Sequence, residues 1–281
     1  MRENISAKNV DSTPISWRET GKDGELLLFL HGLGGSRFAW EPQLKAFSDS
    51  FHCVAWDMPG YGNSQSLENL TFNSVVSSIT HLLDTLEVEK AHLIGLSFGG
   101  MHALHTAILA PERVSSLVIT DSSPSFGLDG TNPEIWVEQR LEQIKLGKEP
   151  KDFAEQVLRS ISGPNFEGEE LENAIYAFSR ITPEAFEASC HCLTTHDVID
   201  ELSSITSPTL VIVGELDQET PPSYSHLLAE KIPHANFLQV EGSGHLTPSE
   251  KPDEFNSAVA SFLLCLLYTS DAADEEDSVD L

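Results

Sequence analysis

A serine between two glycines is the feature of the sequence most clearly suited to chemistry. Residues 93–100 read Leu-Ile-Gly-Leu-Ser-Phe-Gly-Gly and extend a short apolar run that begins at Ala91. An apolar pattern of helical spacing follows, so Ser97 falls at a sharp turn from a strand into a helix, the context of a nucleophile elbow. Side chains in place of the two glycines would collide with the neighbouring strand and helix. The pattern predicts that Ser97 Oγ is a nucleophile at the carboxyl edge of a sheet.

A serine hydroxyl is a weak nucleophile until a base takes its proton, and the chain offers such a base. His245 lies in a Gly-Ser-Gly-His loop directly after an apolar strand pattern. Asp217 follows the preceding strand pattern, where a carboxylate would hold the imidazole in the right tautomer. Asp121, at the end of an earlier strand, stays open as the alternative carboxylate. The sequence therefore predicts a catalytic triad in the chain order Ser97, Asp217, His245.

A glycine-rich turn, His-Gly-Leu-Gly-Gly-Ser, follows the apolar run at 26–30. Glycines allow a backbone to approach a bound ligand closely, so we expect Gly32 to contact the substrate. The backbone N–H groups of Leu33 and Phe98 are the expected donors to a developing oxyanion. One such donor contributes roughly 3 kcal/mol to barrier lowering in measured cases. No Gly-Lys-Ser/Thr follows these glycines, which excludes a P-loop.

Five ordered motifs, between about residues 10 and 264, resemble those of the α/β-hydrolase family: HGLGGS, DMPGYGNS, GLSFGG, GELD and GSGHL. Within that family the chain is most similar to the 3-oxoadipate enol-lactonases and small carboxylesterases. This finer resemblance rests on Thr-Pro-Pro after Asp217 and on Glu250-Lys-Pro after His245. It implies an α/β fold with a mostly parallel sheet of the eight-stranded type, helices on both faces and a helical cap insertion. It also implies hydrolysis of a carboxylic ester or lactone through an acyl-enzyme, with no metal or organic cofactor.

Other activities of this fold stay open. Carbon–carbon bond hydrolases of dienone acids use the same triad, and cofactor-free haloperoxidases or perhydrolases share it. A slow hydrolase-fold ligand receptor can also keep the triad. Dehalogenases and epoxide hydrolases of this fold need a carboxylate nucleophile at the elbow, and Ser97 argues against both.

Strand and helix patterns alternate along the chain, which predicts a parallel sheet covered on both faces. Ligands of such sheets bind beyond the carboxyl ends of the strands, where all the residues singled out above are expected. The strands are expected at about 14–19, 26–30, 52–56, 91–95, 114–120, 209–213 and 236–240. The helices of the sheet layer are expected at about 38–47, 72–87, 98–109, 223–231 and 252–264.

A long insertion separates the strands that end near Thr120 and begin near Thr209. We expect residues 1–122 and 191–264 to form the hydrolase core and residues 123–190 a helical cap, with helices near 133–147, 150–161, 168–180 and 183–192. Trp136 and Arg140 lie four residues apart on one helix face. They would present an aromatic wall and a guanidinium for a substrate carboxylate. The alternative is a Trp packed in the core and an Arg in solvent.

Composition narrows the class of protein further. The formal net charge of −28 argues against nucleic acid and anionic membranes as partners, and it also weighs against an anionic substrate. The sequence has no apolar run of membrane-spanning length, and residues 1–25 lack the pattern expected of a signal peptide. We expect its four cysteines to form no disulfide framework. We therefore expect a cytoplasmic protein acting on a small molecule; the sequence does not indicate its oligomeric state.

The last residues differ abruptly in composition from the rest of the chain. Six acids and no basic residue occupy residues 271–281. The segment from Cys265 onward also resembles an in-frame translation of a sequencing adapter. We expect residues 265–281 to form a disordered, non-native tail.

Overall fold

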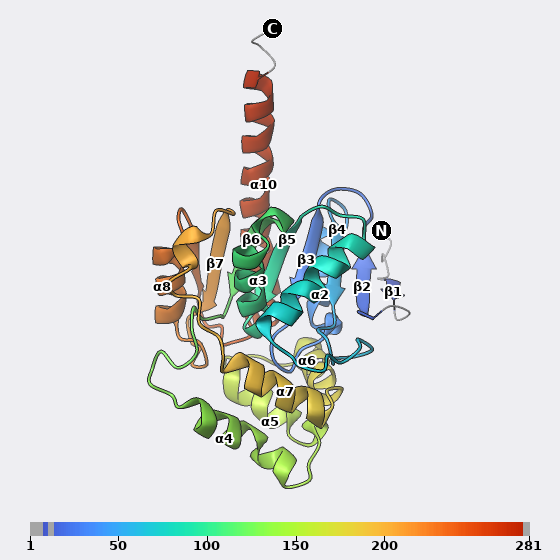
Figure 1. Ribbon diagram of the computed structural model, residues 1–281, viewed down its shortest axis with the longest axis vertical. Helices are drawn as coiled ribbons and strands as arrows, with labels where there is room; N and C mark the ends of the chain where they lie inside the picture. Colours follow the sequence, from blue (N-terminus) through green and yellow to red (C-terminus); the bar gives the residue numbers. More distant parts are fainter. Residues whose placement is uncertain (1–7, 11–13, 278–281) are drawn as a thin grey trace.

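A single mixed sheet forms the centre of the computed structural model, which describes residues 8–10 and 14–277. Its eight strands have the order β1-β2-β4-β3-β5-β6-β7-β8 within this described part (Figure 1). The strands span Lys8–Val10 (β1), Trp17–Thr20 (β2), Leu26–Leu30 (β3), His52–Trp56 (β4), Ala91–Leu96 (β5), Val114–Thr120 (β6), Thr209–Gly214 (β7) and Asn236–Val240 (β8).

Parallel pairing dominates the sheet, as predicted. Every pair from β4 through β8 is parallel, whereas β2 pairs antiparallel with both β1 and β4. The first strand was expected at 14–19, but β2 begins at Trp17, and the short edge strand β1 was not predicted. Three residues without apolar alternation carry no strand signal, and β1 forms only because β2 offers it a free edge.

Alternating side chains of the strands feed two separate hydrophobic clusters, one on each face of the sheet. On the fully buried β3, Leu26, Leu28 and Leu30 pack into one cluster, and Leu27 and Phe29 pack into the other. This division follows from the two-residue period of a strand. Because both faces are apolar, both must be covered by helices.

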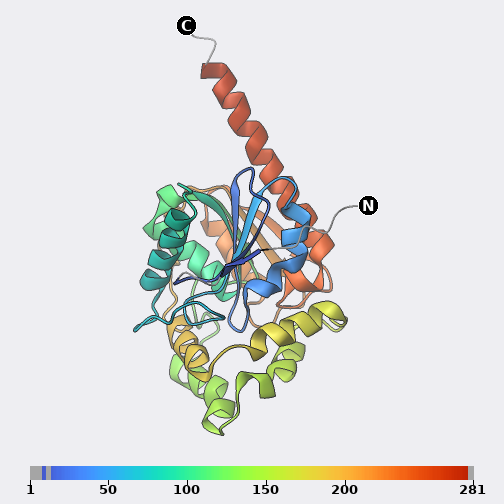
Figure 2. The ribbon, with the colours of Figure 1, turned by 90° about the vertical axis from the view of Figure 1, so that its right-hand side faces the viewer.

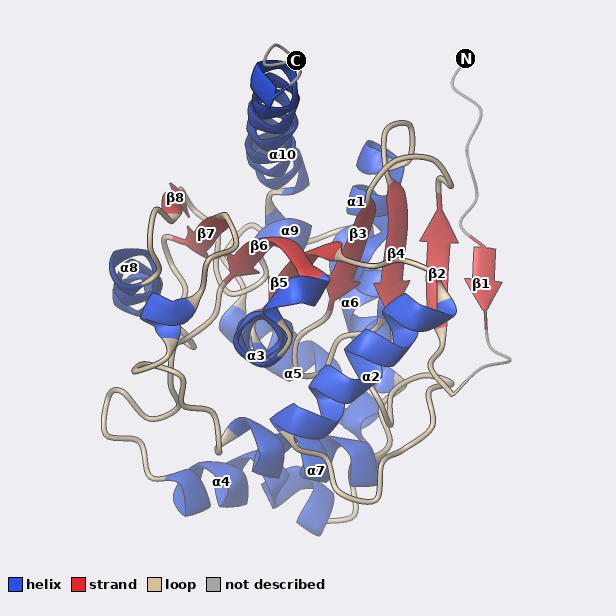
Figure 3. Ribbon diagram, turned by 45° about the horizontal axis from the view of Figure 1, so that its top comes forward, coloured by secondary structure: helices blue, strands red, loops and turns tan. Residues whose placement is uncertain are grey.

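Helices cover both faces of the sheet, as Figure 3 shows. One face packs against α2 (Phe72–Thr85), α3 (Phe98–Leu109) and α8 (Pro222–Lys231). The opposite face packs against α1 (Glu41–Phe47) and the first turns of α10 (Pro252–Asp277). The short helix α9 (Thr247–Glu250) precedes α10, and 3₁₀ turns lie at Arg37–Trp40, Pro111–Arg113, Pro150–Asp152 and Leu202–Ser204.

The insertion between β6 and β7 folds into four α-helices that gather below the carboxyl edge of the sheet (Figures 1 and 2). They are α4 (Pro133–Lys145), α5 (Ala154–Ile161), α6 (Glu169–Ser179) and α7 (Pro183–Leu193), and we call them the cap helices. The expected boundary between cap and core, at residue 190, falls inside α7, because this helix continues to Leu193. The chain turns after it, where His196 N–H donates to Leu193 O. The cap helices thus lie over the strand ends where the predicted site residues lie.

The last helix is longer than the sequence predicted. We expected it to end at Leu264, with a disordered segment behind it, but α10 continues to Asp277 and projects beyond the body (Figure 2). No glycine or proline interrupts the chain after Pro252, and several good helix formers follow, so nothing in the sequence stops the helix. Residues 278–281 of the expected tail lie outside the described residues. Within the described ranges, no helix combines the length and apolar character needed to cross a membrane.

Candidate active site

Ser97 occupies the sharp turn between β5 and α3. Its backbone has φ 53° and ψ −116°, a conformation that costs energy in a residue with a side chain. A Cβ atom at Gly99 would lie 2.0 Å from Leu30 O, and one at Gly95 would lie 2.5 Å from Gly99 O. The two glycines therefore permit the contacts of β5 and α3 with each other and with β3, and these contacts hold the strained turn.

Two hydrogen bonds connect Ser97 with the two other residues of the predicted triad. His245, in the loop after β8, places Nε2 2.9 Å from Ser97 Oγ. Its Nδ1 lies 2.9 Å from Asp217 Oδ2 in the loop after β7. Since the carboxylate only accepts, Nδ1–H is the donor, and this leaves Nε2 free to accept the serine proton. The structure therefore brings all three residues together in the order required for serine activation.

Asp217 is held by its own loop as well as by His245. Thr220 Oγ1 donates to Oδ2 at 2.8 Å, and the backbone N–H groups of Glu219 and Thr220 donate to Oδ1 at 2.9 and 3.1 Å. The hydroxyl of Thr220 also lies 3.4 Å from His245 Nδ1. These contacts fix the carboxylate toward the imidazole. The sequence analysis did not single out Thr220, although it belongs to the Thr-Pro-Pro motif.

Asp121, the alternative carboxylate, has different partners. It directly follows β6, with φ 46°, and accepts hydrogen bonds from Gly214 N at 2.9 Å, Thr247 N at 2.9 Å and Thr247 Oγ1 at 3.0 Å. Its described hydrogen bonds do not include His245. Asp121 therefore joins the end of β7, which leads to Asp217, with the start of α9, two residues after His245.

The charges of these buried groups shift one another's pKa values. Burial alone would lower the pKa of His245, but the charge and hydrogen bond of Asp217, with the charges of Asp121 and Glu219, raise it to about 9. Burial opposes ionisation of Asp217, yet His245 and the hydrogen bonds from Thr220 lower its pKa. Burial and the nearby charge of Asp217 raise the pKa of Asp121 to about 7. The site thus stabilises an imidazolium at His245.

Glu250 ties the loop of His245 to the cap. Its carboxylate accepts from Gly163 N at 2.8 Å, Gly244 N at 2.9 Å and Leu246 N at 3.0 Å, and His245 N donates to Ile161 O at 2.9 Å. Gly163 belongs to the turn between α5 and α6. The Glu-Lys-Pro motif marked this residue by family resemblance alone; its clamping contacts depend on the tertiary structure.

Gly32 and Leu33 lie in the turn after β3, and Gly32 lies beside Ser97. A Cβ atom on Gly32 would lie 3.2 Å from both Ser97 Cβ and Leu96 O, so the turn has little room for a side chain. His31 Nε2 accepts from Met58 N at 3.0 Å, which leaves Nδ1–H to donate to Gly32 O at 2.9 Å. The Phe98 side chain is buried, and its N–H opens α3, where the first backbone donors lack helical acceptors.

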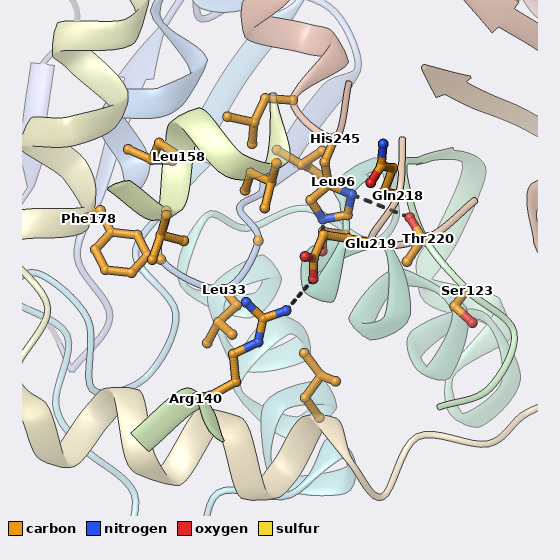
Figure 4. Close-up of a pocket in the computed structure, with 18 of the residues that line it drawn as sticks. Leu33, Leu96, Ser123, Arg140, Leu158, Phe178, Gln218, Glu219, Thr220 and His245 are labelled. Carbon is orange, nitrogen blue, oxygen red and sulfur yellow. Dashed lines mark hydrogen bonds and ion pairs between the residues drawn. The ribbon is translucent and has the colours of Figure 1, made fainter. Parts of the chain in front are cut away.

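A cavity of about 440 Å³ separates the cap helices from the sheet edge. Gly32, Leu33, Ser97 and His245 line its floor, and Trp136 and Arg140 line its cap side. Figure 4 shows Leu158 and Phe178 at one end of the pocket, and Ser123 and Gln218 at the other. This volume lies within the usual range of small-molecule sites, and the ends differ in polarity.

Arg140 is engaged by other side chains of the protein. Its Nη2 lies 2.5 Å from Glu219 Oε2, and its guanidinium stacks over the Trp136 ring at 5.0 Å. Figure 4 shows the ion pair just below the His245 ring. The sequence predicted the proximity of Trp136 and Arg140 but contained no signal for Glu219, which lies 79 positions away from Arg140.

Comparisons with known proteins show which family the chain resembles. The family described as alpha/beta hydrolase fold matches residues 25–252, which is more than half of the chain. The chain is 30% identical to a pimeloyl-[acyl-carrier protein] methyl ester esterase of Vibrio parahaemolyticus, over 89% of this chain and 98% of that protein. It is 27% identical to 3-oxoadipate enol-lactonase 1 of Acinetobacter baylyi, over 84% of this chain and 88% of that one.

Solved structures of similar proteins have the same fold. An enol-lactonase from Burkholderia xenovorans superimposes with a TM-score of 0.81 at 24% identity, covering 89% of this chain and 96% of its own. A thermophilic esterase from Thermogutta terrifontis superimposes with a TM-score of 0.80 at 25% identity, covering 93% and 99%. Both the sequence relatives and the structures therefore include proteins named as lactonases and as esterases.

Proposed function

Because this chain belongs to the α/β-hydrolase family, we propose that it is a serine hydrolase that cleaves a carboxylic ester or lactone through an acyl-enzyme. The observation that carries the proposal is the unbroken hydrogen-bonded chain from Ser97 Oγ through His245 to Asp217, which opens into the cavity. Relatives named as an enol-lactonase and a methyl ester esterase support this reaction class. A cytoplasmic location remains a prediction from the sequence.

Acylation follows from the direction of the hydrogen bonds. His245 Nε2 takes the proton of Ser97 as Oγ forms a bond to the substrate carbonyl carbon, and Asp217 stabilises the imidazolium that results. The backbone N–H groups of Leu33 and Phe98 donate to the oxyanion of the tetrahedral intermediate. As the C–O bond to the leaving group breaks, His245 returns its proton to the departing oxygen. A lactone opens in the same way, with the hydroxyl left on the acyl chain.

Deacylation repeats these steps with water. His245 takes a proton from a water molecule whose oxygen attacks the acyl carbon, and the second tetrahedral intermediate uses the same donors. Its collapse breaks the bond to Ser97 Oγ, which recovers a proton from His245 as the carboxylic acid leaves. Ser97, His245 and the backbone donors thus serve both halves of the reaction. A raised pKa of His245 favours the imidazolium formed in each half.

Turnover of short p-nitrophenyl esters and of an enol-lactone tests the proposal. We expect Ser97→Ala to lower kcat at least ~10³-fold with an unchanged circular dichroism spectrum. A fluorophosphonate, whose fluoride is displaced by an activated serine, should modify the peptide that contains Ser97. Ser160→Ala, at an exposed serine of α5, serves as the matched control. Absent turnover and absent labelling of the unmodified enzyme would leave the ligand receptor as the better description.

A further inference from the structure

The charged side chains of the cavity wall are few. Among the described residues that line it, Arg140 is the one lysine or arginine, and Asp129 and Glu219 are its acids. Amides such as Gln139, Gln143 and Gln218 supply much of the remaining polarity. Even with His245 counted as an imidazolium, the cations of the wall do not outnumber its acids, in a chain whose formal net charge is −28. An anionic substrate finds no excess positive charge here.

The cation of Arg140 is already matched within the protein. Glu219 holds Nη2 at 2.5 Å, and the Trp136 ring covers one face of the guanidinium at 5.0 Å. Roughly a third of each charged side chain is exposed, 29% for Arg140 and 34% for Glu219, so both can also reach a ligand in the cavity. A substrate carboxylate would have to compete with Glu219 for Arg140, and the negative charge of Glu219 would repel it.

The ion pair lies beside the reacting atoms. The backbone N–H of Glu219 donates to Asp217 Oδ1 at 2.9 Å, and the next residue, Thr220, lies against His245. The charge of Glu219 is also among those that act on His245. The part of an ester bound at Ser97 that reaches toward α4 therefore passes Glu219, which pairs with Arg140 of that helix.

We propose that Glu219 is a specificity-determining residue that neutralises Arg140 and thereby restricts the site to uncharged esters and lactones. This inference rests on the proposed function. It assigns uncharged esters and lactones as substrates, and not esters that carry a free carboxylate. Replacement of Glu219 by an uncharged residue frees the guanidinium of Arg140 and turns the same wall into a carboxylate-binding one.

A matched pair of substrates tests this selectivity. p-Nitrophenyl hexanoate and mono-p-nitrophenyl adipate have acyl chains of equal length and differ in the terminal carboxylate. We expect the wild-type enzyme to prefer the neutral ester in kcat/KM. Glu219→Gln should reduce that preference by roughly tenfold, the effect of a hydrogen bond to a charged group. Glu219→Gln combined with Arg140→Gln should lose this gain, because the freed cation is removed.

A second measurement makes the test independent of turnover. In a Ser97→Ala background, quenching of tryptophan fluorescence by the nitrophenyl group reports the Kd of each ester, with Trp136 in the cavity wall. The ratio of the two Kd values should shift as the kcat/KM ratio does. Failure of the proposed function would abolish turnover of both esters in the wild-type enzyme, yet the binding ratio would still respond to Glu219→Gln.

Glu41→Gln is the matched control, since Glu41 pairs with Arg18 outside the cavity and its loss changes the net charge equally. The ratios should be unchanged in this variant. The proposal is overturned if Glu219→Gln leaves both ratios within about twofold of the parent, or if the double variant keeps the gain. It is equally overturned if Glu41→Gln reproduces the effect, because selectivity would then come from the overall charge.

Discussion

Asp121 and Thr247 are joined by two hydrogen bonds, from Thr247 N to Oδ2 at 2.9 Å and from Thr247 Oγ1 to Oδ1 at 3.0 Å. Thr247 lies two residues after His245, and the same carboxylate accepts from Gly214 N, three residues before Asp217. Asp121 is fully buried and thus links the two loops that carry the proposed base and its partner. It positions the site without a hydrogen bond to the imidazole.

The two carboxylates should therefore respond differently to the same substitution. We expect Asp217→Asn to lower kcat about 10⁴-fold, as the corresponding change does in a protease triad, because the imidazole loses its tautomer control and counter-charge. Asp121→Asn should cost far less in kcat, since it weakens the support of the loops and removes one nearby charge but leaves the hydrogen bond between Asp217 and His245 in place. Steady-state kinetics of both variants with one ester gives the ranking. The reverse order would assign the role of triad acid to Asp121.

The pH dependence of activity should have its acid limb above the ordinary range of histidine. The proposed base must be neutral to accept a proton, and the nearby carboxylates raise the pKa of His245 to about 9. We therefore expect kcat/KM to rise with pH and to have a midpoint well above 6.5. Asp121 is ionised in that range, because its pKa is about 7. Asp121→Asn removes that charge and should lower the midpoint. A profile centred near 6.5 in both enzymes would contradict the charge network.

The same shift predicts a trend in stability. A raised pKa in the folded state means that His245 contributes stability fully below its unfolded pKa near 6.5. That contribution is lost as the pH rises through about 9. Urea unfolding at a series of pH values should therefore show a larger decline between pH 6.5 and 9 in the wild type than in His245→Gln. Parallel declines in the two proteins would show that other groups dominate.

Loss of the Glu250 clamp should affect both folding and turnover. Glu250→Gln keeps the shape of the side chain but puts an NH₂ donor among three backbone donors, at a cost of about 1–3 kcal/mol in the free energy of unfolding. We also expect a lower kcat, since Gly244 and Leu246 flank His245. Glu230→Gln, at an exposed glutamate of α8, is the matched control. Equal stability and kcat in Glu250→Gln and wild type would show that the contacts of Glu250 do not support the loop of His245.

The end of α10 should be dispensable. Leu266 still packs against the hydrophobic cluster on one face of the sheet, whereas the later turns of the helix project past the body (Figure 1). Deletion of residues 267–281 should leave esterase activity and Tm nearly unchanged, because the removed residues include the acidic end and no predicted site residue. A Tm loss of several degrees would show that this segment stabilises the body.

Local sequence patterns determined the turn at Ser97, the parallel sheet and the placement of the predicted triad. The Gly95–Ser97–Gly99 turn is a matter of sterics within a few residues, and it appears in the structure where the pattern predicted it. Continuous apolar runs such as Leu26–Leu30 demand burial on both faces, which predicts the parallel sheet and its covering helices. The positions of Asp217 and His245 after neighbouring strands β7 and β8 then follow from topology, because parallel strands end at one edge.

Tertiary structure alone decided which partners these residues have. Asp121 and Asp217 both follow strands at one edge, and only the path of their loops directs one carboxylate to His245 and the other to Thr247. The pairing of Arg140 with Glu219 likewise depends on where a cap helix meets a core loop. Such contacts join residues far apart in the chain, and the hydrogen-bonding capacity of a side chain does not specify its distant partner. Only the packed backbone brings the donor and the acceptor within reach of each other.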